Sequence, residues 1–144
     1  MRYITGGIAL AAALAVTGLA GASTMANAAP VQPKSLYAPS ALVLTVGEGD
    51  HAANTTVRRA VTLSCAPTAS GTHPAATAAC AELRAADGKF DVLAEPASNR
   101  ACPHVWSPVV VTVDGVWDGA RVSYEHTFAN ACTKENALST VFEF

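Results

Sequence analysis

The chain has 144 residues, 51% of them hydrophobic, and a formal net charge of −2. This length and hydrophobic content allow one domain with a modest core. The nearly balanced charge, without a run of basic residues, argues against a nucleic-acid partner. No cofactor-binding motif is present, so no cofactor is expected.

The first 28 residues have the pattern of a secretory signal peptide. Met1-Arg2 gives a positive start, residues 8–16 are apolar, and Ala26-Asn27-Ala28 is a small-x-small cleavage site. The apolar run is too short to span a membrane, so no membrane anchor is expected. We expect cleavage after residue 28, a loose Pro-rich arm at residues 29–40, and a domain at residues 41–144 of a secreted, extracellular protein.

The first part of this domain predicts two strands. Residues 42–46 (Leu-Val-Leu-Thr-Val) are typical of a strand. Residues 59–64 predict a second one, because Val61 and Leu63 alternate with small residues. The segment 70–74 (Ser-Gly-Thr-His-Pro) predicts a turn.

A short helix and an irregular segment follow. Residues 75–86 are rich in alanine, and Gly88 stands just past their end. This pattern favours a helix that carries Cys80. Residues 90–100 contain Pro96 and are expected to be irregular.

The clearest strand signal lies at residues 109–117, which begin with a run of valines. Asp114-Gly115 and Asp118-Gly119 can each form a turn or a bulge. A hairpin turn at Asp118-Gly119 and a bulge at Asp114-Gly115 would let residues 109–117 pair with residues 121–128.

Residues 130–138 predict a second short helix and residues 139–144 a last strand. The complete pattern is an α+β domain with an antiparallel sheet of about five strands and two short helices.

The segment at residues 100–108 (Arg-Ala-Cys-Pro-His-Val-Trp-Ser-Pro) is the most informative part of the chain. Cys102 can tether it by a disulfide, and Pro103 fixes its own φ and biases Cys102 toward extended geometry. A protease binds its substrate in an extended shape. A loop already held in that shape has lost much of the entropy that binding would cost. The residues therefore predict a protease-binding loop.

Four cysteines stand at Cys65, Cys80, Cys102 and Cys132. An even number in a secreted chain indicates two disulfides, and the spacing leaves all three pairings open. A metal site shared with histidines is not expected, because no C-x-x-C or H-x-x-x-H spacing is present.

Six segments together resemble the Streptomyces subtilisin inhibitor family. They are residues 37–47 (YAPSALVLTVG), 59–63 (RAVTL), 71–76 (GTHPAA), 111–117 (VTVDGVW), 121–125 (RVSYE) and 141–144 (VFEF). The likeness runs from about residue 36 to residue 144 and includes all four cysteines. It implies the disulfides Cys65–Cys80 and Cys102–Cys132, secretion by an actinomycete-type bacterium, and a homodimer formed by packing of the sheets.

The same resemblance implies a reactive bond two residues after the third cysteine, at His104-Val105. His104 would enter the primary specificity pocket of a subtilisin-like serine protease. The neighbouring contact residues would be Ala101, Cys102, Pro103 and Trp106.

Asn130, two residues before Cys132, matches a family asparagine that supports the loop from beneath. Its side-chain amide would then donate hydrogen bonds to loop carbonyls. The alternative for this residue is an ordinary helix cap.

The resemblance and the loop together predict a reversible, substrate-like inhibitor. The protease serine can attack the His104 carbonyl, but the disulfide and the sheet would hold both sides of the bond. The new amine would stay near the acyl carbon, so religation would compete with hydrolysis. No nucleophile, base and acid form a recognisable set, so the protein is not expected to be an enzyme.

His104 is an unusual residue for the specificity position. Neutral imidazole can fit a roomy apolar pocket, whereas imidazolium would have to be desolvated. We expect inhibition to weaken as the pH falls through about 6.5, the ordinary histidine value. Strong inhibition of trypsin is not expected, because neither Lys nor Arg occupies this position.

Two other functions remain open from the sequence. The protein could mainly inhibit a secreted metalloprotease. It could also be a non-inhibitory surface partner, such as a transglutaminase substrate that is crosslinked through Gln32 or Lys34 in the arm.

Overall fold

The computed structural model describes residues 39–144, so the expected signal peptide and nearly all of the expected arm lie outside the described residues. The described part is an α+β domain with a five-stranded antiparallel sheet, three α-helices and two 3-10 helices, which confirms the expected class. The elements are β1 Ser40–Glu48, η1 Ala52–Asn54, β2 Thr56–Ala66, β3 Ser70–Gly71, α1 Ala76–Ala85, α2 Phe90–Ala94, β4 Val109–Trp117, β5 Ala120–Phe128, α3 Ala131–Asn136 and η2 Thr140–Phe142.

The sheet has the strand order β3-β2-β1-β4-β5, with β1 in the middle. Side chains of β1 alternate as a half-buried strand requires: Leu42 and Leu44 are buried, whereas Val43 is 46% exposed. β1 begins at Ser40, so this residue belongs to the sheet and not to the arm. The Ser40 hydroxyl donates to the Asp118 carboxylate over 3.1 Å, which fixes the start of β1.

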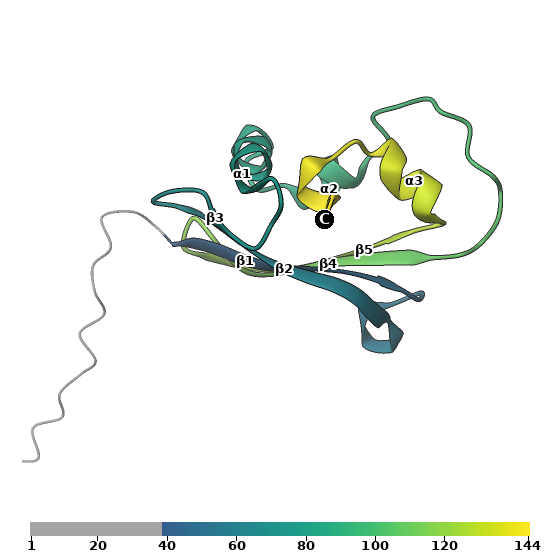
Figure 1. The fold of residues 1–144 in the computed structure, drawn as a ribbon, viewed down its shortest axis with the longest axis horizontal. Helices are drawn as coiled ribbons and strands as arrows, with labels where there is room; N and C mark the ends of the chain where they lie inside the picture. Colours follow the sequence, from purple (N-terminus) through teal and green to yellow (C-terminus); the bar gives the residue numbers. More distant parts are fainter. Residues whose placement is uncertain (1–38) are drawn as a thin grey trace, which may run out of the picture. The chain divides into compact units, whose positions relative to one another are not determined.

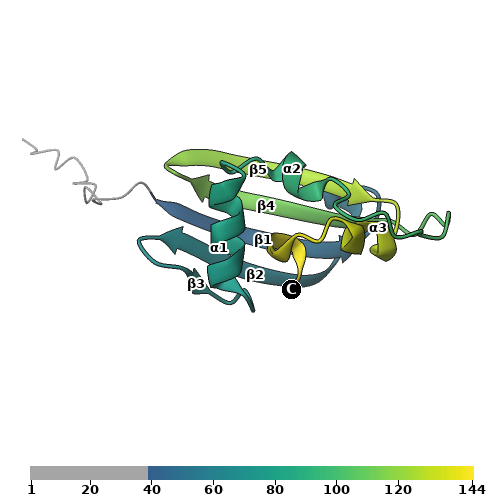
Figure 2. The same cartoon turned by 90° about the horizontal axis from the view of Figure 1, so that it is seen from above.

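The helices α1, α2 and α3 lie together on one face of the sheet (Figures 1 and 2). The core lies between these helices, η2 and the covered face. Its largest fully buried members include Leu44, Leu63, Leu83, Val111, Val113, Val141 and Phe142. Within residues 39–144, no helix is both long and apolar enough to cross a membrane.

The hairpin between β4 and β5 turns at Asp118-Gly119, as predicted. Asp118 has φ 46° and Gly119 has φ 81°. Two successive residues with positive φ form the turn geometry that matches the twist of a two-residue hairpin. Trp117 pairs with Ala120 and Val109 with Phe128, so β4 and β5 are paired along their whole length.

The bulge predicted at Asp114-Gly115 is wrong. The pairing of β4 with both β1 and β5 passes through these residues without a shift. Gly115 has φ 147°, and a Cβ at this position would collide with the carbonyl oxygen of Ala41. Glycine is therefore needed for the close approach of β1, not for an extra residue. The register shifts of the sheet lie between β1 and β2, at Ser40/Ala41 and Val46/Gly47.

The last strand predicted at residues 139–144 is also wrong, because η2 occupies this segment. Val141 and Phe142 are adjacent and are both buried, at 0% and 2% exposure. A half-buried strand cannot bury two successive side chains on one face, whereas a helical turn can. The fifth strand is instead the two-residue edge strand β3, where a turn was expected.

A third short helix, α2, forms where irregular structure was expected. Its buried residues Phe90, Leu93 and Ala94 have the i, i+3, i+4 spacing of one helical face. The expected helix at residues 75–86 is confirmed as α1, and the helix expected at residues 130–138 as the shorter α3.

Both disulfides have the expected partners. Cys65–Cys80 joins β2 to α1, and Cys102–Cys132 joins the segment before β4 to α3. The first bond lies in the core, with both cysteines almost fully buried. The second fastens a surface segment to the domain.

Candidate functional site

A long loop at residues 96–108 connects α2 to β4 and arches outward beyond the helices (Figure 1). Pro103 and His104 in this loop are exposed, and Val105 and Trp106 are 60% and 65% exposed. These four residues are called the tip. Two adjacent, exposed apolar side chains are therefore available for contact with a partner. The sequence-predicted contact residues thus lie together on this loop, and all of them except the half-buried Cys102 are exposed.

Asn130 lies beneath this tip and is only 8% exposed. Its Nδ2 atom donates to the carbonyl oxygens of Pro103 and Val105, each over 3.0 Å. These two carbonyls flank the carbonyl of His104 along the backbone. One amide group therefore holds both sides of the His104 peptide unit.

The same side chain begins α3. Its Oδ1 accepts from the Thr133 N–H over 3.0 Å, and the Thr133 hydroxyl accepts from the Asn130 N–H over 3.1 Å. This reciprocal pair is a capping box with threonine in the third position. The brace and the helix cap, which were alternatives from the sequence, are both present.

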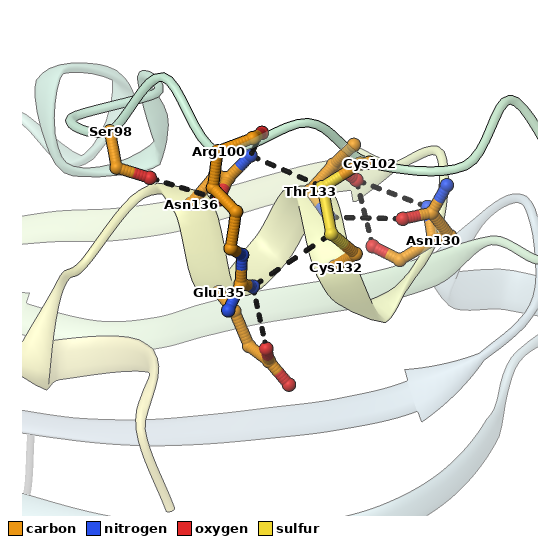
Figure 3. Close-up of polar contacts among 8 residues, drawn as sticks. All are labelled: Ser98, Arg100, Cys102, Asn130, Cys132, Thr133, Glu135 and Asn136. Atoms are coloured by element: carbon orange, nitrogen blue, oxygen red, sulfur yellow. Dashed lines mark hydrogen bonds and ion pairs between the residues drawn. A yellow bond between two sulfur atoms is a disulfide. The ribbon is translucent and has the colours of Figure 1, made fainter.

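Cys102, next to the tip, is tied to α3 by its disulfide with Cys132 (Figure 3). The tip is thus held by the covalent bond from α3 to Cys102 and by the amide of Asn130, the N-cap of α3. Ala101, which precedes Cys102, is exposed.

A second buried asparagine, Asn136, supports the incoming part of the loop (Figure 3). Its Nδ2 donates to the Arg100 carbonyl over 2.8 Å, and its Oδ1 accepts from the Ser98 hydroxyl over 2.9 Å. The Arg100 side chain forms an exposed ion pair with Glu135 at 2.8 Å. Sequence reasoning missed Asn136, although it lies four residues after Cys132, one helical turn along α3.

The outgoing part of the loop is fixed by backbone contacts. The Ser107 N–H donates to the Ala129 carbonyl over 2.9 Å, and the Pro108 carbonyl accepts from the Gly49 N–H over 3.2 Å. The Trp106 indole N–H donates to the Asp50 carboxylate over 3.1 Å. Nothing in the sequence singled out Asp50.

The arrangement suits presentation of a peptide to a partner. Among residues 39–144, no group of three or more His, Cys, Asp or Glu side chains could hold a metal ion. At Tyr124 on β5, burial and then Asp91 raise the pKa to about 12. What the loop offers is an exposed backbone whose carbonyls and ends are held in place.

Comparisons with known proteins agree with this geometry. Residues 38–130 match the family described as subtilisin inhibitor-like. The chain belongs to this family of protease inhibitors.

Three relatives illustrate the likeness. The "Transglutaminase-activating metalloprotease inhibitor" of Streptomyces mobaraensis is 57% identical, with both chains covered completely. The "Subtilase-type protease inhibitor" of Streptomyces coelicolor is 62% identical over 92% of this chain and 90% of its own length. Among solved structures, Streptomyces caespitosus sermetstatin in complex with Bacillus licheniformis subtilisin is 49% identical, with a TM-score of 0.68 over 74% of this chain and 99% of that one.

Proposed function

We propose that the protein is a secreted, reversible, substrate-like inhibitor of subtilisin-like serine proteases, with His104-Val105 as its reactive bond. The observation that supports this most is the single amide of Asn130 holding the carbonyls of Pro103 and Val105. The solved relative bound to subtilisin and the name of the Streptomyces coelicolor relative agree with this choice of target.

The proposed mechanism follows from where the loop is held. The protease serine attacks the His104 carbonyl as it would attack a substrate. After cleavage, the acyl side stays attached through Cys102–Cys132, and the leaving side stays attached through Ser107, Pro108 and β4. The new amine of Val105 remains beside the acyl carbon at a high effective concentration, so religation competes with water.

Tight binding would come from the same rigidity. His104 and Val105 are exposed, whereas the backbone around them is fixed before the protease arrives. A pre-organised loop loses little further entropy on binding, and its extended backbone can pair with the protease cleft.

A titration of subtilisin with the purified protein, followed by mass spectrometry of the inhibitor, tests this proposal. We expect stoichiometric inhibition and slow cleavage confined to His104-Val105. Rapid cleavage at other bonds, or no inhibition, would contradict it. Mass spectrometry of the protein from a culture supernatant would at the same time test secretion and cleavage after residue 28.

Inhibition of a metalloprotease is a second candidate, favoured by the full-length likeness to the Streptomyces mobaraensis inhibitor. A complex preformed with subtilisin distinguishes the two functions. Loss of metalloprotease inhibition in that complex would place both enzymes on the 96–108 loop, whereas retained inhibition would require a separate surface. The crosslinking alternative depends on Gln32 and Lys34, which lie outside the described residues.

We further propose a homodimer that forms through the sheet face opposite the helices. α1, α2 and α3 leave this face uncovered (Figures 1 and 2), and Val43 at the centre of β1 is 46% exposed. Sedimentation equilibrium of the protein and of a Val43→Glu variant tests the proposal. We expect a dimer for the first and a monomer for the second.

A further inference from the structure

The leaving side of the loop is held by a second segment that does not belong to α3. This segment, residues 49–55, connects β1 to β2 and contains η1. Its Gly49 N–H donates to the Pro108 carbonyl over 3.2 Å, and its Asp50 carboxylate accepts the Trp106 indole N–H over 3.1 Å. The 49–55 segment therefore contacts the loop at two points after the proposed reactive bond.

Asp50 is itself held in position by the sheet. Its carbonyl oxygen accepts from the Thr127 hydroxyl on β5 over 2.9 Å. Two residues later, the Ala52 N–H donates to the Glu125 carboxylate, also on β5, over 2.9 Å. The carboxylate that receives the indole is thus carried by a backbone with two attachments to a regular strand.

Trp106 is fixed at one edge of its ring only. The indole N–H has its partner in Asp50, whereas 65% of the residue's surface remains exposed. A tryptophan whose polar atom is already satisfied presents a large apolar surface at little further cost in desolvation or rotamer entropy. This is the property of an anchor residue at an interface.

The brace by Asn130 cannot supply this orientation. Asn130 holds the backbone carbonyls of Pro103 and Val105, and α3 has no hydrogen bond to the Trp106 side chain. Without Asp50, the backbone at residue 106 would stay in place while the indole explored other rotamers.

We propose that Asp50 is a positioning residue for the leaving side of the loop, and that it makes Trp106 a specificity-determining residue. The inference rests on the proposed function. The contact should strengthen inhibition most for proteases whose leaving-side subsite is apolar and wide enough for an indole ring. It should not strengthen inhibition of a protease whose subsite there is narrow or charged.

A double-mutant cycle on the complete mature protein tests the proposal, with subtilisin as the probe and the inhibition constant as the readout. Asp50→Ala should weaken inhibition by about 3- to 10-fold, the range of one net hydrogen bond. Asp50→Asn should restore most of this loss, because its amide oxygen also accepts. In a Trp106→Phe background, Asp50→Ala should change inhibition by less than about twofold.

The matched control is Asp91→Ala, which removes the same charge from an exposed position on α2. It should leave the inhibition constant unchanged. The melting temperature of Asp50→Ala should equal that of the parent, because the exposed Asp50 carboxylate accepts its hydrogen bond from an equally exposed indole. An equal effect of Asp50→Ala in the parent and in the Trp106→Phe background would overturn the proposal, as would no effect in either.

A readout without protease separates this inference from the proposed function. Hydrogen exchange of the Trp106 indole N–H, followed by NMR in the free protein, should be faster in Asp50→Ala than in the parent. Absence of subtilisin inhibition by the parent would refute the proposed function and with it the gain in specificity. An exchange rate that Asp50→Ala leaves unaltered would refute the positioning itself.

Discussion

The Asn130 side chain donates to the carbonyl oxygen of Pro103 over 3.0 Å, so the residue that begins α3 also holds the backbone just before His104. The two roles use different atoms: Nδ2 serves the loop, whereas Oδ1 serves the Thr133 N–H. The roles can therefore be separated by substitution.

Asn130→Asp should keep the helix cap and lose the brace. Aspartate is as good an N-cap as asparagine, but an ionised carboxylate has no proton for the carbonyls of Pro103 and Val105. We expect the free energy of unfolding to fall by about 1–3 kcal/mol, because the nearly buried carboxylate faces two carbonyl oxygens. Cleavage of His104-Val105 by subtilisin should accelerate by roughly tenfold or more. Urea unfolding and timed mass spectrometry measure the two quantities.

Thr133→Val is the matched control, since it removes the hydroxyl that accepts from the Asn130 N–H and leaves Nδ2 in place. It should cost about 1 kcal/mol of stability and leave the cleavage rate unchanged. Equal cleavage rates for the parent and Asn130→Asp would show that the brace does not protect the bond.

The two disulfides should differ in what their removal affects. Replacing Cys65 and Cys80 by serine should cost about 3 kcal/mol through loop-closure entropy, with inhibition retained wherever the variant is folded. Replacing Cys102 and Cys132 should free the acyl side of the loop, so the protein should become a substrate that is cleaved at His104-Val105 and released. Inhibition progress curves at 25 °C separate temporary from lasting inhibition, and similar behaviour of both variants would contradict this division of roles.

Most of the sheet could be predicted because its signals are local. The alternation in β1, the valine run of β4 and the Asp118-Gly119 turn each determine their own conformation. The final segment could not be placed in this way. Val141 and Phe142 are β-forming residues, and only their packing against the core at 0% and 2% exposure turns them into a helical turn.

Site residues could be predicted where the family resemblance matched them to a motif position. They could not be predicted where they contact the loop from a distant part of the chain. Asn130 could be found because it stands two residues before Cys132 in the sequence. Asp50 could not, because its contact with Trp106 joins residues 56 positions apart across an exposed loop. Asn136 lies between these two cases. Its place one helical turn after Cys132 can be read from the sequence, but its hydrogen bonds with Ser98 and Arg100 depend on the path of the loop.

His104 should determine which enzymes are inhibited. His104→Lys should gain strong trypsin inhibition, because the loop would then offer a basic side chain at the specificity position. His104→Leu should inhibit subtilisin at least as well as the parent, because an apolar side chain enters an apolar pocket without the desolvation of a polar group. Inhibition constants of the two variants against trypsin and subtilisin measure these effects. No gain of trypsin inhibition by His104→Lys would refute the assignment of the specificity position to His104.

His73 should make the stability of the domain depend on pH. It is 5% exposed; its Nδ1 accepts from the Ala75 N–H over 3.1 Å, and its Nε2 faces the Val141 carbonyl at 3.4 Å. Burial lowers the pKa of His73, and nearby Arg59 adds to this effect, although the Val141 carbonyl opposes it. A proton on Nδ1 would also displace the Ala75 N–H.

The folded-state pKa of His73 therefore lies below the value of about 6.5 that an unfolded histidine has. Between the two values the unfolded chain binds more protons, so the free energy of unfolding should fall as the pH drops below about 6.5. His73→Gln keeps an acceptor and a donor but does not titrate, so this part of the decline should disappear. Urea unfolding at intervals from pH 8 to pH 5 measures the free energy of unfolding of both proteins. Their difference isolates His73, because the two proteins differ only at this residue. A decline of His73→Gln parallel to that of the parent would show that His73 is not the group responsible.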